Sequence, residues 1–169
     1  MKLSIGSLAP HHDRLDFDCG EPALNTFLQR LARQQSVRDF NRTYVAAFPG
    51  ESRIQGFYAV SAANIHFENF PQALNLPRYP VPVARLGRLA VDQRSQGSGV
   101  GLALLQHAMS LTESLSQQIG LYALFVEAKN ESAAAFYQRY GFERMPDHPL
   151  NLFLTTDLIR RARVGDSER

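Results

Sequence analysis

One glycine-rich segment has the composition and the position of a phosphate-binding loop. It reads RSQGSGVG (94–101) and stands between a short apolar run, LGRLAVD (86–92), and a helical pattern that begins near Val100. Free N–H groups and the dipole at a helix start attract an anion such as pyrophosphate, and glycine lets the backbone come close to it. The segment therefore predicts an anion site, to which Arg94 would add positive charge.

Other interpretations of this loop are a dinucleotide-binding fingerprint, a Walker A loop and a turn without a ligand. The dinucleotide fingerprint normally follows the first strand of a parallel unit, whereas this segment follows a hairpin pattern and a proline-rich stretch. A Walker A loop is excluded because no Lys-Ser or Lys-Thr pair follows the glycines. The glycines alone do not separate an anion site from a plain turn.

The segments around the loop must position it, and they alternate between helical and strand-like patterns. Apolar residues at helical spacing, such as Leu24, Leu28 and Leu31, predict a helix over 21–35. Four prolines predict a loop over 68–82. The other patterns are helical at 100–118 and 131–140 and strand-like at 42–48, 54–67, 86–92, 121–128 and 150–158. Together they predict a mixed α/β domain around one central sheet.

The composition is that of one ordinary globular domain. Of the 169 residues 44% are apolar and 20% are charged, and the net charge of +2 is too small to indicate a nucleic-acid partner by itself. Cys19 is the single cysteine, which excludes an internal disulfide, and the five scattered histidines favour no metal site. No apolar run reaches the roughly 18 residues of a membrane span, and residues 1–17 do not resemble a secretory signal. We expect a cytoplasmic protein that does not enter a membrane.

Two motifs together resemble the GNAT superfamily of N-acetyltransferases. Arg94-x-x-Gly97-x-Gly99 is similar to the (Gln/Arg)-x-x-Gly-x-(Gly/Ala) motif with which that family binds the pyrophosphate of CoA, and NESAAAFYQRYGF (130–142) resembles its second signature. The resemblance implies the GNAT fold over residues 1–163, a mixed, splayed central sheet of about six to seven strands flanked by about four helices. Residues 164–169 are expected to form a disordered tail.

The resemblance also implies which residues bind acetyl-CoA. The backbone of Leu89, Ala90 and Val91 is expected to pair with the pantetheine arm. Asn130 is expected beside that arm, and Tyr137 is expected to face the thioester sulfur. The expected pyrophosphate loop consists of Arg94, Gln96, Gly97, Ser98, Gly99, Val100 and Gly101.

Tyr137 is the candidate general acid for acetyl transfer. A neutral amine must attack the thioester, and the departing thiolate needs a proton. A phenol with a pKa of about 10 stays protonated at neutral pH and can supply that proton. Tyr140, one helical turn further on, is expected to be a packing residue.

A general base is less evident. Many GNAT enzymes carry a Glu on the strand before the loop, but residues 85–91 contain no carboxylate. Glu127, on the following strand, is a candidate base or a partner in an ion pair. An acceptor amine that is already partly neutral depends less on a general base. α-Amino groups titrate at about 7.7–8.0, whereas the lysine side chain titrates at about 10.4. The missing carboxylate therefore favours an α-amine over a lysine side chain.

A narrower resemblance covers nearly the whole chain. FDCG (17–20), RTYV (42–45), GFY (56–58) and PVPV (80–83), followed by LGRLAVD (86–92), are similar to the GNAT toxins of bacterial toxin–antitoxin pairs. The resemblance implies acetylation of the α-amino group of aminoacyl-tRNA, which blocks translation. It also implies neutralisation by a ribbon-helix-helix antitoxin and a tendency to form homodimers.

Three arginines are candidates for contacts with the acceptor, because arginine suits bidentate phosphate binding. They are Arg42, Arg85 and Arg88, and solvation or ion pairing at the surface suits each of them equally. Two other functions stay open. One is a GNAT enzyme for a small amine, an amino acid or a protein N-terminus, and the other is a CoA-binding or partner-binding module without turnover. The intact motif residues weigh against such a module.

Overall fold

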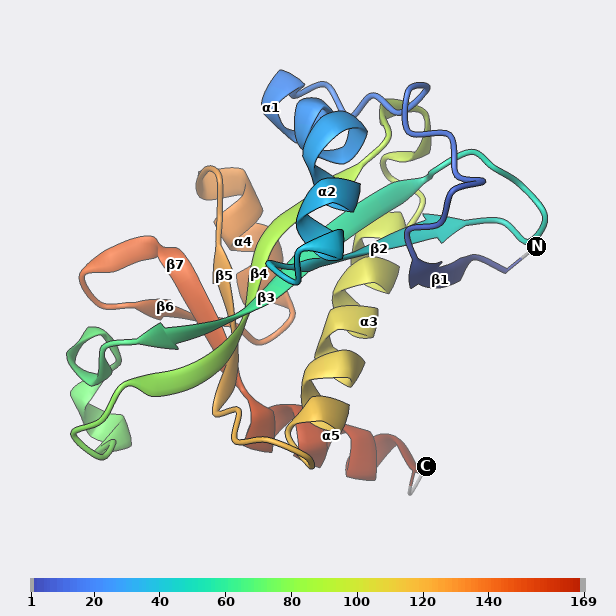
Figure 1. Ribbon diagram of the computed structural model, residues 1–169. Coiled ribbons are helices and arrows are strands. Elements are labelled where there is room, and N and C mark those ends of the chain that lie inside the picture. The colour runs from blue at the N-terminus through green and yellow to red at the C-terminus, as the bar shows by residue number, and fades with distance from the viewer. Residues whose placement is uncertain (1, 168–169) are drawn as a thin grey trace. The chain divides into compact units, whose positions relative to one another are not determined.

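Seven strands form one mixed sheet in the computed structural model, which describes the backbone of residues 2–167 and side chains as far as Arg163 (Figure 1). The strands are β1 (Ser4–Ser7), β2 (Arg42–Ala47), β3 (Gly56–Ile65), β4 (Val81–Val91), β5 (Ala123–Glu127), β6 (Glu143–Met145) and β7 (His148–Thr155). Their order is β1-β2-β3-β4-β5-β7-β6. β4 and β5 are parallel, whereas β1–β2, β2–β3, β5–β7 and β6–β7 pair antiparallel. The predicted mixed sheet is confirmed.

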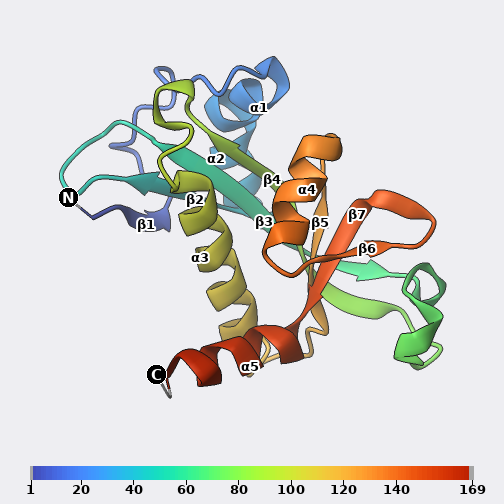
Figure 2. The same cartoon turned by 180° about the vertical axis from the view of Figure 1, so that it is seen from behind.

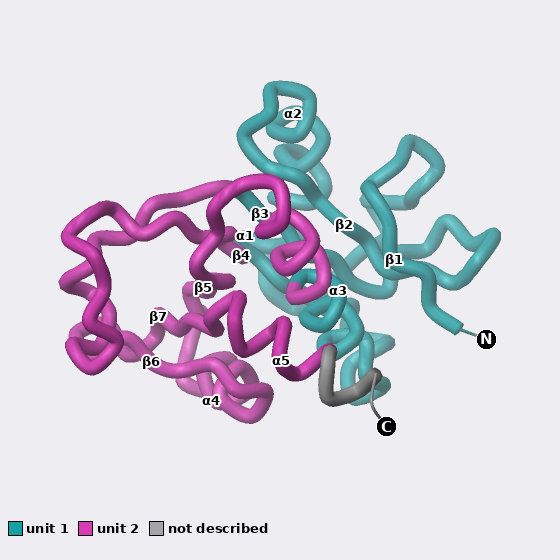
Figure 3. Tube along the Cα trace, turned by 90° about the horizontal axis from the view of Figure 1, so that it is seen from below, with its two compact units in different colours: residues 1–61, 87–108 teal, residues 62–86, 109–169 magenta. Residues whose placement is uncertain are grey.

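The helices are α1 (Pro22–Thr26), α2 (Ala32–Val37), α3 (Val100–Leu115), α4 (Glu131–Arg139) and α5 (Thr156–Ser167). A π-helical turn joins α1 to α2. The chain divides into two compact units, coloured separately in Figure 3. Unit 1 comprises Met1–Ser61 and Gly87–Ala108, and unit 2 comprises Ala62–Leu86 and Met109–Arg169. It remains a prediction that residues 1–163 form one domain.

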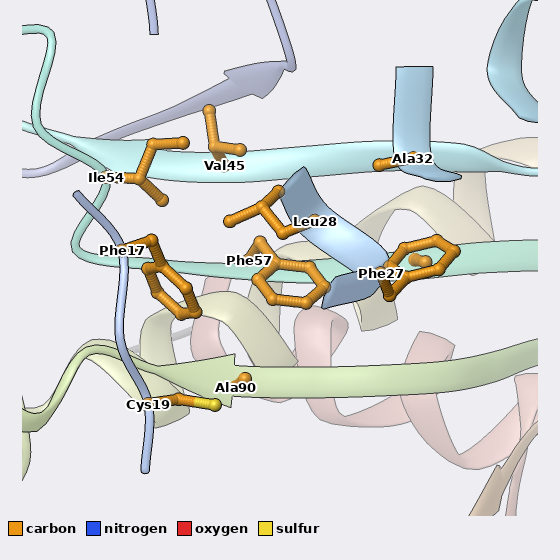
Figure 4. Close-up of a cluster of buried hydrophobic side chains, with 10 residues drawn as sticks. Phe17, Cys19, Phe27, Leu28, Ala32, Val45, Ile54, Phe57 and Ala90 are labelled. Carbon is orange, nitrogen blue, oxygen red and sulfur yellow. The ribbon is translucent and has the colours of Figure 1, made fainter. Parts of the chain in front are cut away.

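In unit 1, the α1–α2 segment covers one face of the strands (Figure 4). Leu28 and Ala32 of this segment are buried in one cluster with Val45 of β2 and Phe57 of β3. Ala90 of β4 belongs to the same cluster. The strand that leads into the glycine-rich loop is thus anchored in the core through a side chain.

The first half of α3 lies against the opposite face of the unit 1 strands (Figure 2). Gly56 of β3 is the point of closest approach. A Cβ atom there would lie 2.9 Å from both the Ala90 carbonyl oxygen and the Leu104 Cδ1 atom, so only glycine fits. This contact fixes the start of α3 against the end of β4, and with them the loop that joins the two.

An aromatic cluster holds the middle of α3. The Tyr58 hydroxyl lies 2.6 Å from His107 Nδ1, and Tyr44 stacks on Tyr58 with ring centroids 5.1 Å apart. Burial lowers the pKa of His107 and raises that of Tyr58, so both are neutral at pH 7. His107 is therefore a structural residue of α3.

Unit 2 has a core of its own between the strands and the proline-rich stretch. Phe70, which comes from the proline-rich stretch, packs edge-on against Phe153 of β7 with centroids 5.0 Å apart. Thr156 begins α5, and its Oγ1 donates to the carbonyl of Leu121 at 2.8 Å. The start of the C-terminal helix is thereby tied to the segment that precedes β5.

Several boundaries differ from the sequence prediction. The predicted loop over 68–82 ends early, because β4 already begins at Val81. The predicted strand over 150–158 ends at Thr155 and is followed by α5. The predicted tail starts within α5, and its last residues, 168–169, lie outside the described part, so the tail stays a prediction. No helix among the described residues is long and apolar enough to cross a membrane.

Candidate functional site

The glycine-rich loop of unit 1 leaves a row of backbone N–H groups without partners. Gly97 and Gly99 have φ values of 81° and 87°, which favour glycine, while nothing crowds the space where their Cβ atoms would lie. Within the described part of the chain, no N–H from Gln96 to Gly101 donates to another group. α3 begins at Val100 directly behind them. The loop therefore has the donors and the helix dipole that an anion site needs.

Arg94 is bound within its own unit. Its guanidinium contacts Asp16 at 2.7 Å and Asp92 at 3.0 Å. Asp92 is almost fully buried, and it also accepts from the backbone N–H groups of Arg94 and Asp18. Burial alone would raise the pKa of Asp92, but these hydrogen bonds and the nearby charge of Arg94 lower it to about 2. Arg94 thus links the loop to the N-terminal segment, and the donors of the loop that have no partner among the described residues are backbone amides.

The depressed pKa of Asp92 predicts a pH dependence of stability. The folded state holds this carboxylate charged down to a pH of about 2, whereas an unfolded Asp titrates at about 3.9. Its contribution is complete above the unfolded value and is lost as the pH falls through the folded one. We expect denaturation curves between pH 5 and about 2 to show a smaller loss of stability for Asp92→Asn than for the wild type. Equal slopes for the two proteins would contradict this assignment.

Polar contacts brace the rest of the loop. Ser95 donates through its hydroxyl to the buried Gln55, and the Ser98 hydroxyl donates to the carbonyl of Ser95. Gln96 donates through Nε2 to the carbonyls of Val91 and Cys19, at 3.1 and 3.3 Å. The side chains of Gln96 and Ser98 therefore shape the loop from within.

The remaining residues near the loop that were predicted to bind acetyl-CoA also pack within unit 1. Ala90 and Val100 are buried, and Leu89, Val91 and Gly101 are half-buried. No sequence signal marks the bracing roles of Asp16 and Gln55, because both residues lie far from the loop in sequence. For Asp92 a local signal existed, since aspartate is a common N-cap and here accepts from the amide of Arg94 at a 3-10 turn.

Asn130 and Tyr137 belong to unit 2 and lie on α4. Asn130 caps the helix, and its Oδ1 accepts from the amide of Ala133 at 2.9 Å. Tyr137 is 7% exposed and packs against Phe142, with ring centroids 5.5 Å apart. Burial raises the pKa of Tyr137, and no described residue hydrogen-bonds to its hydroxyl. The phenol is therefore protonated at neutral pH, with its proton uncommitted.

Tyr140 lies one turn beyond Tyr137 in a different environment. It is half-buried, and its ring packs edge-on against Phe136 at 5.3 Å. Gly141 ends the helix with a φ of 98°, and its amide donates to the carbonyl of Gln138. Tyr140 thus has the contacts of a packing residue.

Each of the remaining candidate residues has a local partner. Glu127 and Arg85 form an ion pair at 2.8 Å on adjacent strands of unit 2. In unit 1, Arg42 pairs with Asp39 at 2.7 Å, and the guanidinium of Arg88 lies 3.9 Å from the ring centroid of Phe27. Arg85 and Glu127 are thus two candidates that contact each other. Among the described residues, no group of three His, Cys, Asp or Glu side chains could hold a metal ion.

Comparison with known proteins identifies the family. The model of the acetyltransferase (GNAT) domain matches residues 39–144. A tRNA-acetylating toxin of Mycobacterium tuberculosis is 37% identical over 156 residues, which cover 91% of this chain and 92% of that protein. The match therefore extends well beyond the two motifs.

Solved structures of related proteins agree with this result. A mutant of KacT has a TM-score of 0.90 and 35% identity, covering 96% of this chain and 99% of that one. AtaT in complex with acetyl-methionyl-tRNAfMet has a TM-score of 0.89 and 32% identity, covering 95% of this chain and 99% of that one. AtaT has also been solved with the C-terminus of the antitoxin AtaR, and the AtaTR complex with acetyl-CoA. The chain belongs to the GNAT family of acetyltransferases.

Proposed function

We propose that this protein transfers the acetyl group of acetyl-CoA to the α-amino group of an aminoacyl-tRNA. The observation that carries the proposal is the 37% identity to a tRNA-acetylating toxin over 91% of the chain. The complex of AtaT with acetyl-methionyl-tRNA, at 32% identity, supports the same acceptor. The reaction would block translation, which makes the protein a toxin.

The glycine-rich loop fits the pyrophosphate of acetyl-CoA. Its amides from Gln96 to Gly101 have no partner within the described chain, and Gly97 and Gly99 combine positive φ values with open space around them. Acetyl-CoA, when bound, supplies the acetyl group as a thioester. The loop would hold the pyrophosphate, the backbone of Leu89–Val91 would bind the pantetheine arm, and Asn130 would lie beside that arm.

Tyr137 would act as the general acid. Its buried phenol has a raised pKa and an uncommitted proton, so it can donate from Oη to the sulfur that leaves. Transfer would be direct, without a covalent enzyme intermediate, and it would depend on positioning of the two substrates. Cys19, the single thiol, is buried in the core.

The acceptor amine would need little help from a base. Glu127 is engaged by Arg85, and the strand before the loop contains no carboxylate. The α-amino group of an aminoacyl ester is partly neutral at pH 7, because free α-amines already titrate at about 7.7–8.0. Arg42 and Arg85 keep 53% and 43% of their side chains exposed and could contact tRNA phosphates together with Arg88.

Partners and location follow from this activity. Because AtaT is bound by the antitoxin AtaR, we also propose that an antitoxin neutralises this protein. Its ribbon-helix-helix fold and the formation of a homodimer stay predictions. Aminoacyl-tRNA is a cytoplasmic substrate, which places the proposed reaction in the cytoplasm.

Gly97→Ala is expected to raise the KM for acetyl-CoA about tenfold, since a left-handed backbone costs an L-residue roughly 1–2 kcal/mol and the loop would turn its amides away. Gly50→Ala is the matched control. Gly50 has the same φ of 81° and the same open surroundings, but it lies in the β2–β3 connection. Steady-state kinetics of both variants should show a changed KM for Gly97→Ala alone. An equal change in both variants would remove the loop from the donor site.

Induced expression in a bacterial host tests the proposed function. The wild type should arrest growth, and Tyr137→Phe, expressed at the same soluble level, should not. Normal growth with a soluble wild type that binds CoA would exclude the toxin and point to a small amine or a peptide N-terminus as acceptor. Arrest by both proteins would indicate a binding module without turnover.

A further inference from the structure

Unit 1 contains a cavity whose lining includes no residue of the glycine-rich loop. It has a volume of about 360 Å³ and lies between the segment after β1, helix α2 and the start of β2. Pockets for small organic ligands begin at about 300 Å³. The cavity is therefore large enough for a compact molecule.

Three arginines line this cavity and make it positive. Arg42 is paired with Asp39. Among the described residues, no carboxylate lies within ion-pair distance of Arg14 or Arg33, and the nearest contact of Arg14 is the carbonyl of Gln29 at 3.5 Å. Guanidinium groups without carboxylate partners, gathered at one cavity, suit an anion with several oxygens, such as a phosphate.

Apolar residues make up a further part of the cavity wall. Leu8, Ala9, Pro10 and Val37 line it together with Ser7, Ser36 and Thr43, and Val37, the last residue of α2, is 75% exposed. A phosphate ion alone would leave this wall uncovered, whereas a nucleotide carries a planar base that can cover it. We propose that the cavity binds a nucleotide, with its phosphate at the arginines and its base against the apolar residues of the wall.

The nucleotide can be a free molecule or part of the tRNA, and the second source rests on the proposed function. Titration of uridine 5′-monophosphate into the full chain, followed by calorimetry with saturating CoA present, tests the site itself. We expect Arg14→Ala and Arg33→Ala to weaken binding at least tenfold. Arg78→Ala, which removes an exposed arginine outside the cavity, should bind like the wild type.

The melting temperature separates a binding role from a structural one. Arg33 is exposed, so Arg33→Ala should keep the melting temperature of the wild type while the affinity for the nucleotide falls. No binding to the wild type, or equal affinity in all variants, would overturn the proposal.

A second assay shows whether the bound nucleotide belongs to the tRNA or is a free molecule. A KM for aminoacyl-tRNA that is about tenfold higher in both cavity variants, with kcat unchanged, would assign the site to a tRNA nucleotide. An unchanged KM together with weakened nucleotide binding would assign it to a free nucleotide. If no acetyl transfer to tRNA occurs at all, the proposed function fails, while the titration still decides whether the cavity binds a nucleotide.

Discussion

Tyr137→Phe is expected to lower kcat for acetyl transfer by about 10²–10⁴-fold, the contribution typical of a positioned general acid. The substitution removes only the hydroxyl that would protonate the leaving thiolate. The KM for acetyl-CoA should change little, because the loop amides that would hold the donor lie elsewhere in the chain. The melting temperature should also be preserved, since no described residue depends on the Tyr137 hydroxyl.

Tyr140→Phe is the matched control for this prediction. It deletes the same atom one helical turn away, from a tyrosine whose ring packs against Phe136. Its kcat should stay within about twofold of the wild type, because it would supply no proton to the reaction. A similar decrease of kcat in the two variants, or an unchanged kcat in Tyr137→Phe, would show that Tyr137 is not the general acid.

Asp92→Ala is expected to destabilise the fold by about 3 kcal/mol, the scale for breaking a buried, hydrogen-bonded ion pair. The buried carboxylate joins Arg94 to the amide of Asp18, so its loss leaves these donors unsatisfied where the loop meets the N-terminal segment. Chemical denaturation with the wild type as reference measures the difference. The affinity for acetyl-CoA should fall as well, because Asp92 holds the start of the glycine-rich loop.

Asp16→Ala tests whether the burial of Asp92 is the cause of the large loss of stability expected for Asp92→Ala. Asp16 contacts the same guanidinium at 2.7 Å but is 44% exposed. Ion pairs exposed to this degree contribute about 0–1 kcal/mol, so this variant should lose less than about 1 kcal/mol. A loss as large as that of Asp92→Ala would show that the pair with Arg94, rather than the buried carboxylate, holds the loop.

The sequence was most informative where local chemistry decides the structure. The loop could be predicted because its glycines must adopt positive φ and because a helix start follows them. The helix from Glu131 was predictable from its cap, Asn130, and its terminal glycine, Gly141. Such signals depend on neighbours in sequence and need no knowledge of tertiary contacts.

Long-range contacts explain what the sequence did not reveal. Arg94 was expected to add positive charge to the loop, and its ion pair with Asp16 could not be foreseen because Asp16 is distant in sequence. Likewise, the early start of β4 at Val81 depends on parallel pairing with β5, which local proline content cannot show. The cavity beside α2 is also formed by separate segments, and no motif marks it.

The most direct test of the account is acetyl transfer from labelled acetyl-CoA to purified aminoacyl-tRNA, with uncharged tRNA and free amino acids as parallel acceptors. We expect label in the charged tRNA alone, released by mild alkaline hydrolysis as an N-acetyl-amino acid. Label in free amino acids or peptides, with none in charged tRNA while the protein still binds CoA, would contradict the proposed function.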